Sequence, residues 1–314
     1  MQTKEYIDLF VAIQKISREL NTEVYIVGGF VRDLYYANYD CLQDIDFLVS
    51  KNPKLIAEKL QVDLGGDIKP YPDFLTCKLV NINLTDIKEL DFAEFRTEIY
   101  RQSGALPTVG RGKFSEDSLR RDFTINTLIL NINSVIEIFF NNAFSVVQIE
   151  KHIIDNLQRI NDLKNRVVRI LHNQSFSDDP TRIFRAIRYK LLIKGSYENA
   201  TEMHLQEAIN QNYFKNIDGY RISGELEKLF NMPGFDLLDI FRELNRFHIL
   251  ERLEFISEEN IDKVQNYLSN MPKYDNSSSR FYTFMKHLLK YQSTEKQKFL
   301  IKRYNLKKSQ LKEV

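Results

Sequence analysis

Cysteine is scarce in this chain, where only Cys41 and Cys77 occur among 314 residues. Two cysteines do not make a disulfide framework, and no group of Cys and His residues has the spacing of a zinc site. A chain without disulfides or zinc suits a reducing compartment. We therefore expect a cytoplasmic protein.

Long apolar runs and an excess of either charge are also absent. Because no run of about 18 apolar residues occurs, we expect no membrane span. Lys and Arg number 44 against 43 Asp and Glu, a net charge of +1, so nucleic-acid binding would need a local basic patch. The N-terminal stretch has helical spacing with acids mixed in, which predicts a packing helix rather than a signal peptide. The composition is that of a globular protein long enough for two or more domains.

The first half of the chain alternates between helical and extended patterns. We expect helices at 4–20, from about 30, and at 53–62, and strands at 23–27, 44–49, 73–80, 88–95 and 134–140. The Gly65-Gly66 pair, Pro70 and Pro72 mark connecting turns. These strands would form one small mixed sheet with flanking helices.

After about residue 150 the strand patterns fade and helical periodicity takes over. The helical segments are 156–171, 180–193, 200–212, 220–231, 235–247 and 278–304. Asp179 before Pro180 is expected to cap one of these helices, with the proline at its first position. The fold class expected is therefore α+β, with a sheet-containing head followed by helices.

Asp44 and Asp46 are two acids in a segment that otherwise reads as a buried strand, Asp44–Val49. Side chains alternate along a strand, so both carboxylates point to one face. Such a pair repels unless a cation lies between them, and Mg²⁺ held by carboxylates and substrate phosphates is a common arrangement. The other interpretations are a pair of exposed strand-edge acids, or the metal site of a nuclease or phosphohydrolase. Asp91, in another strand-like segment, is either a third carboxylate or a simple strand-end acid.

Gly28 and Gly29 precede the acid pair, with Asp44 fifteen residues after Gly29. Glycines let the backbone approach a phosphate without interference from a Cβ atom, and Arg32 adds a positive charge. These residues therefore predict a triphosphate-binding turn. An ordinary strand-to-helix turn, with Arg32 and Asp33 as a surface ion pair, is the alternative.

Two later motifs carry charged residues beside apolar positions. RRDFTIN, from Arg120 to Asn126, offers donors and acceptors for phosphate and ribose, or is a helix start of mixed charge. DDPTR, from Asp178 to Arg182, places Asp179 and Arg182 three residues apart at a helix start. A capping acid with an i,i+3 ion pair is the alternative for the second motif.

The C-terminal stretch 281–314 is basic. It holds nine Lys and Arg residues and two acids, which gives nine minus two, or +7. The charge favours contact with a phosphate backbone, whereas a solvated helix face is the alternative.

Taken together, four segments in this order resemble the class II tRNA nucleotidyltransferases, the family that includes CCA-adding enzymes and bacterial poly(A) polymerases. GGFVRD with DID resembles the first motif of the family, RRDFTIN the second, DDPTRIFRAIRY the nucleobase-reading motif and RISGELEKLF the neck-helix motif. The resemblance covers about residues 23–231. It implies a nucleotidyltransferase head at 1–147, a helical neck at 148–231, and a helical body with a short basic tail at 232–314.

The resemblance also implies roles for individual residues. Asp44 and Asp46, with Asp91 as a candidate third ligand, would hold two catalytic Mg²⁺ ions. Gly28, Gly29 and Arg32 would bind the triphosphate. The ribose and phosphate would be bound by Arg121, Asp122 and Asn126, the nucleobase by Asp179, Arg182, Arg185 and Arg188, and the RNA by Lys298, Lys302, Arg303, Lys307 and Lys308.

Asp179 and Arg182 would then select bases without a template. Cytosine and adenine each present an amino donor beside a ring-nitrogen acceptor, which suits an Asp acceptor and an Arg donor. Uracil and guanine present the reverse pattern and would leave buried groups unpaired, at about 1–3 kcal/mol each.

The implied activity is transfer of CMP and AMP from CTP and ATP to the 3′ end of tRNA, with release of pyrophosphate. A CC-adding, an A-adding or a poly(A) enzyme is the alternative within the family, and an inactive nucleotide- or RNA-binding protein the alternative outside it. The loop between Glu98 and Glu116 is full length, which disfavours a CC-adding enzyme. Gln158 and Arg159 occupy positions where the family commonly has hinge glycines. No protein partner is implied.

Overall fold

A computed structural model of the chain describes residues 3–270 and 280–312. The chain forms two compact units. The N-terminal unit comprises the residues up to Ile99 together with Pro107–Leu171, and the C-terminal unit comprises Tyr100–Leu106 together with the residues from His172 onward. The expected division into head, neck and body remains a prediction, because the contacts separate only these two units.

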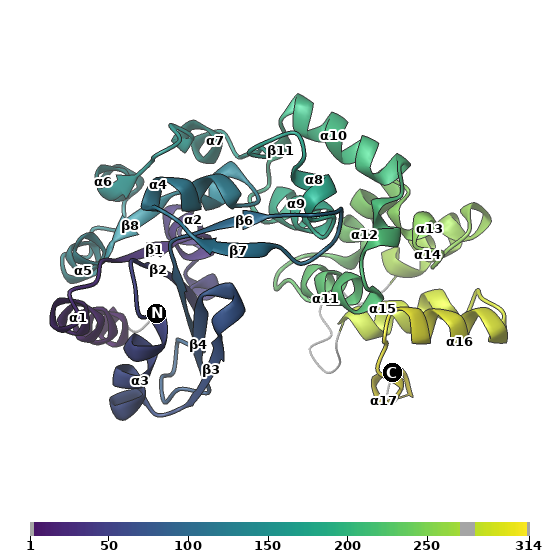
Figure 1. The fold of residues 1–314 in the computed structure, drawn as a ribbon. Helices are drawn as coiled ribbons and strands as arrows, with labels where there is room; N and C mark the ends of the chain where they lie inside the picture. The colour runs from purple at the N-terminus through teal and green to yellow at the C-terminus, as the bar shows by residue number, and fades with distance from the viewer. Residues whose placement is uncertain (1–2, 271–279, 313–314) are drawn as a thin grey trace. The chain divides into compact units, whose positions relative to one another are not determined.

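The N-terminal unit is built on a seven-stranded sheet (Figure 1). Its order is β3-β4-β5-β2-β1-β8-β9. The pair β2 and β5 is parallel, and the other neighbouring pairs are antiparallel, which confirms the expected mixed sheet. The strands are β1 (Val24–Val27), β2 (Asp44–Val49), β3 (Asp67–Tyr71), β4 (Thr76–Val80), β5 (Glu89–Glu94), β8 (Ile129–Asn131) and β9 (Ile153–Ile154). A separate antiparallel ladder joins β6 (Arg96–Ile99) and β7 (Thr108–Arg111).

Helices cover this sheet because their apolar faces match its buried side chains. The helices are α1 (Thr3–Glu19), α2 (Gly29–Tyr35), α3 (Pro53–Leu64), α4 (Phe114–Asp117), α5 (Ile132–Phe140), α6 (Val146–His152) and α7 (Ile160–Lys164). Helix α1 packs against α3 and α5. The rings of Phe10 and Phe139 meet edge to face, with centroids 5.3 Å apart. Such aromatic pairs bury large areas and fix the orientation of the packed helices.

One strand expectation was wrong. The segment 134–140 was expected as a strand because its β-branched and aromatic residues favour extended structure. It lies instead in α5, where Ile132, Val135, Ile138 and Phe139 are buried at helical spacing. The Asn131 side chain caps this helix by accepting a hydrogen bond from the backbone N–H of Asn133. The strand next to β1 is the preceding segment, β8.

The C-terminal unit is mainly helical, as expected. Its helices are α8 (Ser175–Asp178), α9 (Arg182–Leu192), α10 (Asn199–Asn210), α11 (Gly219–Phe230), α12 (Leu237–Arg246), α13 (Ile249–Arg252), α14 (Ile261–Ser269), α15 (Arg280–Leu289), α16 (Thr294–Arg303) and α17 (Lys308–Lys312). The single helix expected at 278–304 is divided by a turn at Ser293, whose side chain caps α16. The first two residues of that expected helix, 278 and 279, lie outside the described residues.

One smaller expectation also needs correction. The helix expected at 156–171 is limited to α7, and the two-residue strand β10 (Val167–Val168) follows it. Another two-residue strand, β11 (Ser196–Tyr197), lies between α9 and α10.

Cys41 and Cys77 are both free thiols, in agreement with the absence of a disulfide framework. None of the helices in the described ranges is long and apolar enough to cross a membrane.

Candidate functional site

Asp44 and Asp46 lie on one face of β2, where both are exposed, while Ile45 and Phe47 between and after them are buried. In the parallel pairing with β5, Asp44 lies opposite Glu89 and Asp46 opposite Asp91. Partial loss of hydration raises the pKa of Asp44 above its usual value, and the charge of Glu89 adds to this effect. Glu89 and Asp91 are already paired with Lys78, so Asp44 and Asp46 are the two acids of this face where a cation would be stabilised.

The carboxylates that fit Mg²⁺ at this place are two, Asp44 and Asp46, rather than three. Asp44 makes no ion pair with any described residue, so its charge is available to a cation. Asp91 is instead engaged by Lys78, whose Nζ lies 3.0 Å from Oδ2, although Asp91 Oδ1 is buried without a hydrogen-bond partner. Within the described ranges no three Asp, Glu, His or Cys side chains gather as a metal-binding group. Two carboxylates plus substrate phosphates is a usual Mg²⁺ arrangement, so the role of Asp91 remains a prediction.

Gly28 forms the turn between β1 and α2 with a φ of +71°, a conformation that favours glycine. A Cβ atom at this position would lie 3.2 Å from Asp46 Oδ2 and 3.9 Å from Arg121 Nη1. A Cβ at Gly29 would lie 3.4 Å from Arg32 Nη2. The backbone of the turn therefore passes directly beside one carboxylate and two guanidinium groups, as a triphosphate site requires.

Arg32, expected to bind the triphosphate, is almost entirely buried. Its Nε and Nη2 donate to the two carboxylate oxygens of Asp33 at 3.0 and 2.7 Å, and its Nη1 donates to Asn126 Oδ1 at 2.8 Å. Burial raises the pKa of Asp33, and the adjacent Arg32 opposes that effect. The ion pair is therefore internal, not the surface pair considered as the alternative, and it holds α2 in place behind the glycine turn.

The same network extends into RRDFTIN. Asn126 donates to Asp122 Oδ1 at 3.0 Å, and the same oxygen accepts from the backbone N–H of Phe123 at 2.8 Å. Both Asp122 and Asn126 are buried. The structure thus joins Arg32, Asn126 and Asp122 in one chain of hydrogen bonds, and their contact with ribose remains a prediction.

Arg121 is held by Asp117, a residue that the sequence patterns did not single out. Its Nη2 donates to Asp117 Oδ2 at 2.8 Å, and its Nε to the same oxygen at 3.2 Å. Its Nη1 faces the Gly28 turn. Arg121 is therefore placed beside the Gly28 turn, on which Asp46 also borders.

The nucleobase-reading motif lies in the C-terminal unit. Asp179 Oδ1 accepts hydrogen bonds from the backbone N–H and the hydroxyl of Thr181, at 3.1 and 2.7 Å. Arg182 is buried, donates to Ser175 Oγ at 2.7 Å and lies 6.0 Å from the centroid of the Tyr100 ring. The i,i+3 ion pair that was the alternative interpretation is not among these contacts, since the carboxylate of Asp179 has other partners.

Helix α9 begins at Arg182, with Thr181 at the N-cap position, so the expected start at Pro180 was two residues early. The backbone N–H of Arg182 bonds to the carbonyl of Asp179 at 3.0 Å, and that of Ile183 to Pro180 at 3.2 Å. These i,i+3 bonds make a tight turn before the α-helical hydrogen bonds begin.

Arg221, in the neck-helix motif, is the second residue that sequence reasoning missed. Its Nη2 lies 2.8 Å from Asp179 Oδ1, and its Nη1 donates to the Gly104 carbonyl at 2.7 Å. Charge alone gave no sign of this pairing, because the two residues are 42 positions apart. Arg221 orients the carboxylate that is expected to read the base.

Arg185 and Arg188 lie further along α9 and face Glu225 on α11. Arg188 Nη2 is 3.5 Å from Glu225 Oε2. Burial alone would raise the pKa of Glu225, but the charges of Arg188, Lys228 and Arg185 hold it below its usual value. Their predicted contact with the nucleobase is untested. In the structure Arg188 pairs with Glu225, and the Arg185 guanidinium lies 5.4 Å from the centroid of the Tyr189 ring.

The basic residues expected to bind RNA lie in α16, α17 and the turn between them. Lys298, Lys302, Lys307 and Lys308 are exposed and make no ion pair with a described residue. Arg303 is half-buried, with its guanidinium 5.7 Å from the centroid of the Tyr304 ring. Four of the five cations are therefore available to a phosphate backbone.

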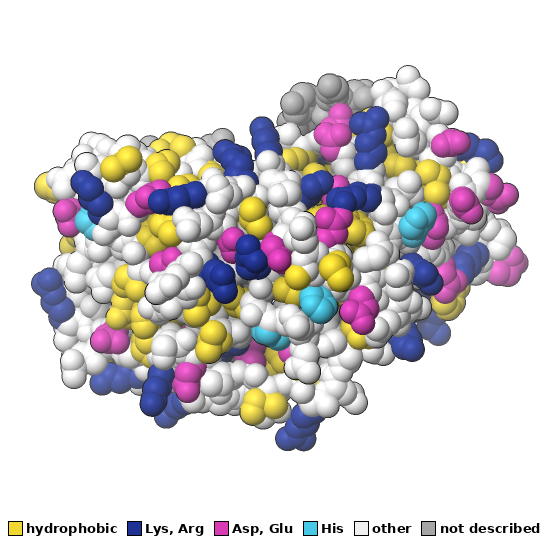
Figure 2. Space-filling model, turned by 90° about the horizontal axis from the view of Figure 1, so that it is seen from above, with side chains coloured by type: hydrophobic (Ala, Val, Ile, Leu, Met, Phe, Trp, Pro, Cys, Tyr) yellow, Lys and Arg dark blue, Asp and Glu magenta, His cyan; other side chains and the backbone are white. Residues whose placement is uncertain are grey.

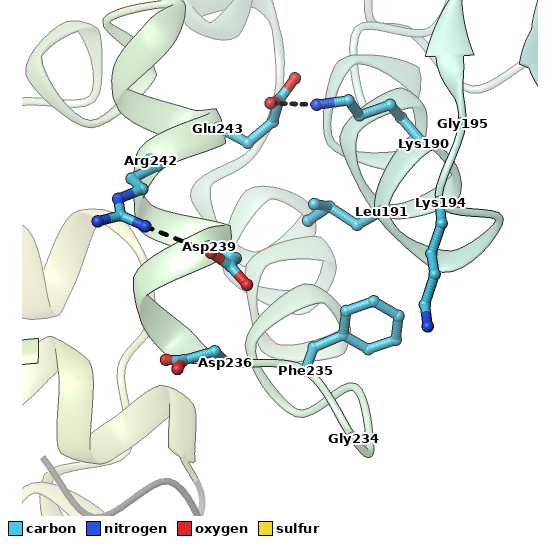
Figure 3. Close-up of a pocket in the computed structure, with 10 residues that line it drawn as sticks. All are labelled: Lys190, Leu191, Lys194, Gly195, Gly234, Phe235, Asp236, Asp239, Arg242 and Glu243. Atoms are coloured by element: carbon cyan, nitrogen blue, oxygen red, sulfur yellow. Dashed lines mark hydrogen bonds and ion pairs between the residues drawn. The ribbon is translucent and has the colours of Figure 1, made fainter. Parts of the chain in front are cut away.

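A pocket of about 590 Å³ lies elsewhere in the C-terminal unit, between the end of α9 and α12 (Figure 3). The residues that line it are Lys190, Leu191, Lys194, Gly195, Gly234, Phe235, Asp236, Asp239, Arg242 and Glu243. Lys190 pairs with Glu243, and Arg242 with Asp239 at 3.6 Å. The three cations and three acids of the lining balance, so the pocket has no excess of positive charge to attract a triphosphate.

Comparison with known proteins places these features in a family. Residues 24–169 match the Poly A polymerase head domain. The A-adding tRNA nucleotidyltransferase of Geobacter sulfurreducens is 36% identical over 255 residues, which are 76% of this chain and 27% of that protein. The A-adding tRNA nucleotidyltransferase of Aquifex aeolicus is 32% identical over 230 residues, 73% of this chain and 25% of that protein.

The likeness extends to a solved structure. A CCA-adding enzyme in an apo form matches with a TM-score of 0.75 and 30% identity, over 98% of this chain and 69% of that chain. By contrast, the chain spans only about a quarter of the length of the two A-adding relatives.

Proposed function

Because this chain belongs to the class II tRNA nucleotidyltransferase and poly(A) polymerase family, we propose that it transfers nucleotides to the 3′ end of tRNA. The substrates are CTP and ATP, and pyrophosphate is released. The observation that carries the proposal is the Gly28 turn, which brings a backbone suited to phosphate within contact distance of Asp46 and Arg121.

The N-terminal unit supplies the chemistry. Asp44 and Asp46 would hold Mg²⁺, which when bound neutralises phosphate charge and favours an attacking hydroxyl. The N–H groups of the Gly28-Gly29 turn and the Arg121 guanidinium bind and orient the triphosphate. Such transfer needs little covalent participation by the protein, so positioning and charge supply most of the rate enhancement.

The C-terminal unit supplies base selection. Asp179 Oδ1 is engaged by Thr181 and Arg221, and its Oδ2 accepts no hydrogen bond from a described residue. That oxygen can accept from the amino group of cytosine or adenine, while Arg182 donates to the adjacent ring nitrogen. Uracil and guanine would place a carbonyl against the carboxylate and leave it unpaired.

A narrower activity, addition of the terminal A alone, is the second candidate. It is favoured by the A-adding relatives from Geobacter sulfurreducens and Aquifex aeolicus. The Asp179 and Arg182 pair accepts both bases, so these two side chains do not separate the candidates.

An incorporation assay separates them. Purified protein, Mg²⁺ and each labelled nucleoside triphosphate are incubated with tRNA that lacks CCA, with tRNA that lacks only the terminal A, and with a generic RNA. Addition of C and then A to the first tRNA supports the full activity, and addition of A to the second tRNA alone supports the A-adding activity. Extension of generic RNA indicates a poly(A) polymerase, and no incorporation at all contradicts the enzyme proposal.

The metal assignment has its own test. Asp46→Asn should abolish incorporation and leave tRNA binding nearly unchanged, because the side chain is exposed and contributes little to the fold. Asp73→Asn, another exposed acid of the N-terminal unit, is the matched control and should retain activity. Activity that survives Asp46→Asn would show that the metal lies elsewhere.

A further inference from the structure

Asp117, the last residue of α4, is a carboxylate with no solvent exposure that binds two consecutive arginines. Its Oδ1 accepts from Arg120 Nε and Nη2 at 2.9 and 2.7 Å. Its Oδ2 accepts from Arg121 Nη2 and Nε at 2.8 and 3.2 Å. A buried acid that binds two guanidinium groups is costly unless both pairings are kept, so it fixes both side chains firmly.

Arg120 and Arg121 differ in whether all three of their guanidinium nitrogens have an acceptor. Arg120 uses its Nη1 as well, donating to Glu98 Oε1 at 2.9 Å, and Glu98 also binds Arg96. Arg121 Nη1 donates to no atom of a described residue. The cluster consists of three arginines and two acids, Asp117 and Glu98, so its net charge is three minus two, or +1. The donor left without an acceptor is on Arg121.

That donor points at the glycine turn. Arg121 Nη1 lies 3.9 Å from the place a Cβ would occupy at Gly28, and Asp46 Oδ2 lies 3.2 Å from the same place. The open end of Arg121 and the metal-binding carboxylate thus flank one stretch of backbone. A phosphate on the turn would be within reach of Arg121 Nη1.

We propose that Asp117 is a positioning residue, which holds the Arg121 guanidinium by two of its nitrogens so that the third faces the nucleotide's phosphates. The inference rests on the proposed function. Burial alone would raise the pKa of Asp117, but Arg121 and Arg120 hold it below the usual range, so the carboxylate stays charged at neutral pH. Arg120 serves as the second partner that balances the buried charge.

Asp117→Asn tests this inference against Glu98→Gln. Both changes remove one buried charge from the same cluster, but only Asp117 touches Arg121. We expect Asp117→Asn to raise the KM for nucleotide on the order of tenfold with little change in kcat, because ground-state and transition-state binding are both lost. Glu98→Gln should lower the melting temperature comparably and leave the KM near that of the unaltered protein. Equal KM values for the two variants would overturn the inference.

A second pair of variants covers the case in which Asp117→Asn does not fold. Asp117→Glu keeps the charge and shifts it by one methylene, with Glu98→Asp as its control, and the same contrast in KM is expected. The activity of the unaltered protein distinguishes a failure of this inference from a failure of the proposed function. If the unaltered protein incorporates nucleotide and the KM of Asp117→Glu does not change, only the role of Asp117 is wrong. If the unaltered protein incorporates none, the nucleotidyl-transfer proposal itself fails.

Discussion

Gly28 combines a backbone requirement with a steric one. Its φ of +71° with a ψ of −131° is unfavourable for any residue with a Cβ, at about 1–3 kcal/mol, and the added atom would press on Asp46. Gly28→Ala should therefore lower the free energy of unfolding by about that amount and raise the KM for nucleotide. Chemical denaturation and steady-state kinetics measure the two effects.

Gly224→Ala is the matched control for that substitution. Gly224 lies within α11, and a Cβ there would meet nothing within 4 Å. Alanine should stabilise this helix by roughly 0.5–1 kcal/mol without changing nucleotide kinetics. If Gly28→Ala behaved like Gly224→Ala, the close approach of the turn to Asp46 would have no functional role.

Gln158 occupies a position where the family commonly has a hinge glycine, and it keeps a glycine-like backbone with a φ of +55°. Gln158→Gly should relieve about 1–2 kcal/mol of strain and lose roughly 0.5–1 kcal/mol to the greater freedom of the unfolded chain. The net stabilisation expected in chemical denaturation is therefore between about 0 and 1.5 kcal/mol. Arg159→Gly, at a φ of −111°, should destabilise instead. A loss of stability in Gln158→Gly would contradict the strain argument.

Sequence reasoning located the residues whose roles follow from local spacing. Asp44 and Asp46 share a face because strand side chains alternate, and Gly28 lies in the turn because its neighbours favour a strand and a helix. Asp117 and Arg221 were missed because their importance depends on partners brought together by the fold. Arg32 was expected at the triphosphate from its charge, and that role remains a prediction; only the structure shows that Asp33 and Asn126 accept hydrogen bonds from its guanidinium.

At the level of elements, composition and periodicity disagreed in α5. Its β-branched and aromatic residues favour a strand, but their spacing buries one helical stripe against α1. Packing decided the outcome, since isolated propensities amount to only a few tenths of a kcal/mol per residue. The expected strand next to β1 is supplied by the three residues before the helix.

His287 on α15 makes the packing of this helix sensitive to pH. Its ring stacks on Tyr267 of α14 with centroids 3.4 Å apart, its Nε2 lies 3.2 Å from the Tyr291 hydroxyl, and its Nδ1 is buried without a partner. Burial, with a smaller effect of Lys290, lowers the pKa of His287 to about 4. The folded protein therefore holds this histidine neutral where the unfolded chain is protonated.

The sign of the pH dependence follows from this difference. Between about pH 6.5 and pH 4 the unfolded chain binds a proton that the folded protein excludes, so the free energy of unfolding falls as the pH is lowered. The contribution of His287 is about 1–3 kcal/mol, complete above that range and lost below it. His287→Phe should show a correspondingly smaller loss of stability between pH 7 and pH 4 in chemical denaturation. If His287→Phe lost as much free energy of unfolding between pH 7 and pH 4 as the unaltered protein, His287 would not be the source of the pH dependence.

At the scale of the whole chain, charge is nearly balanced. On the face shown in Figure 2, Lys and Arg side chains are interspersed with Asp and Glu side chains. The excess of basic residues instead lies at the C-terminal end, where four lysines of the α16 and α17 region are exposed. RNA binding should therefore depend strongly on that local region.

Replacing Lys298, Lys302, Lys307 and Lys308 together by glutamine tests this expectation. If all four contact phosphates, the slope of log K against log salt should fall by about 3–4, since each contact contributes about 0.7–0.9. Filter binding of tRNA across a salt series measures the slope. Replacing the exposed Lys4, Lys15, Lys51 and Lys69 of the N-terminal unit removes the same charge and should change the slope little. Equal changes in both variants would contradict a specific basic surface.

The overall class and order of elements were predictable, because the change from mixed to helical periodicity follows the composition of the chain. The extents of the two compact units were not predictable. Periodicity changes near residue 150, and the head expected from the family resemblance, residues 1–147, remains a prediction. The contacts end the N-terminal unit at Leu171 and assign Tyr100–Leu106 to the C-terminal unit. Nothing in the composition of these seven residues, Tyr100–Leu106, indicates that they pack with the C-terminal unit.

The position of β2 has a consequence for hydrogen exchange. In the order β3-β4-β5-β2-β1-β8-β9, three strands lie on each side of β2, so it is the strand furthest from either edge. Its amides should lose their protection only when the sheet opens as a whole, whereas β3 and β9 should fray from the edges. We therefore expect the backbone that carries Asp44 and Asp46 to exchange most slowly in the sheet, and the spacing of the two carboxylates to persist when the edge strands open.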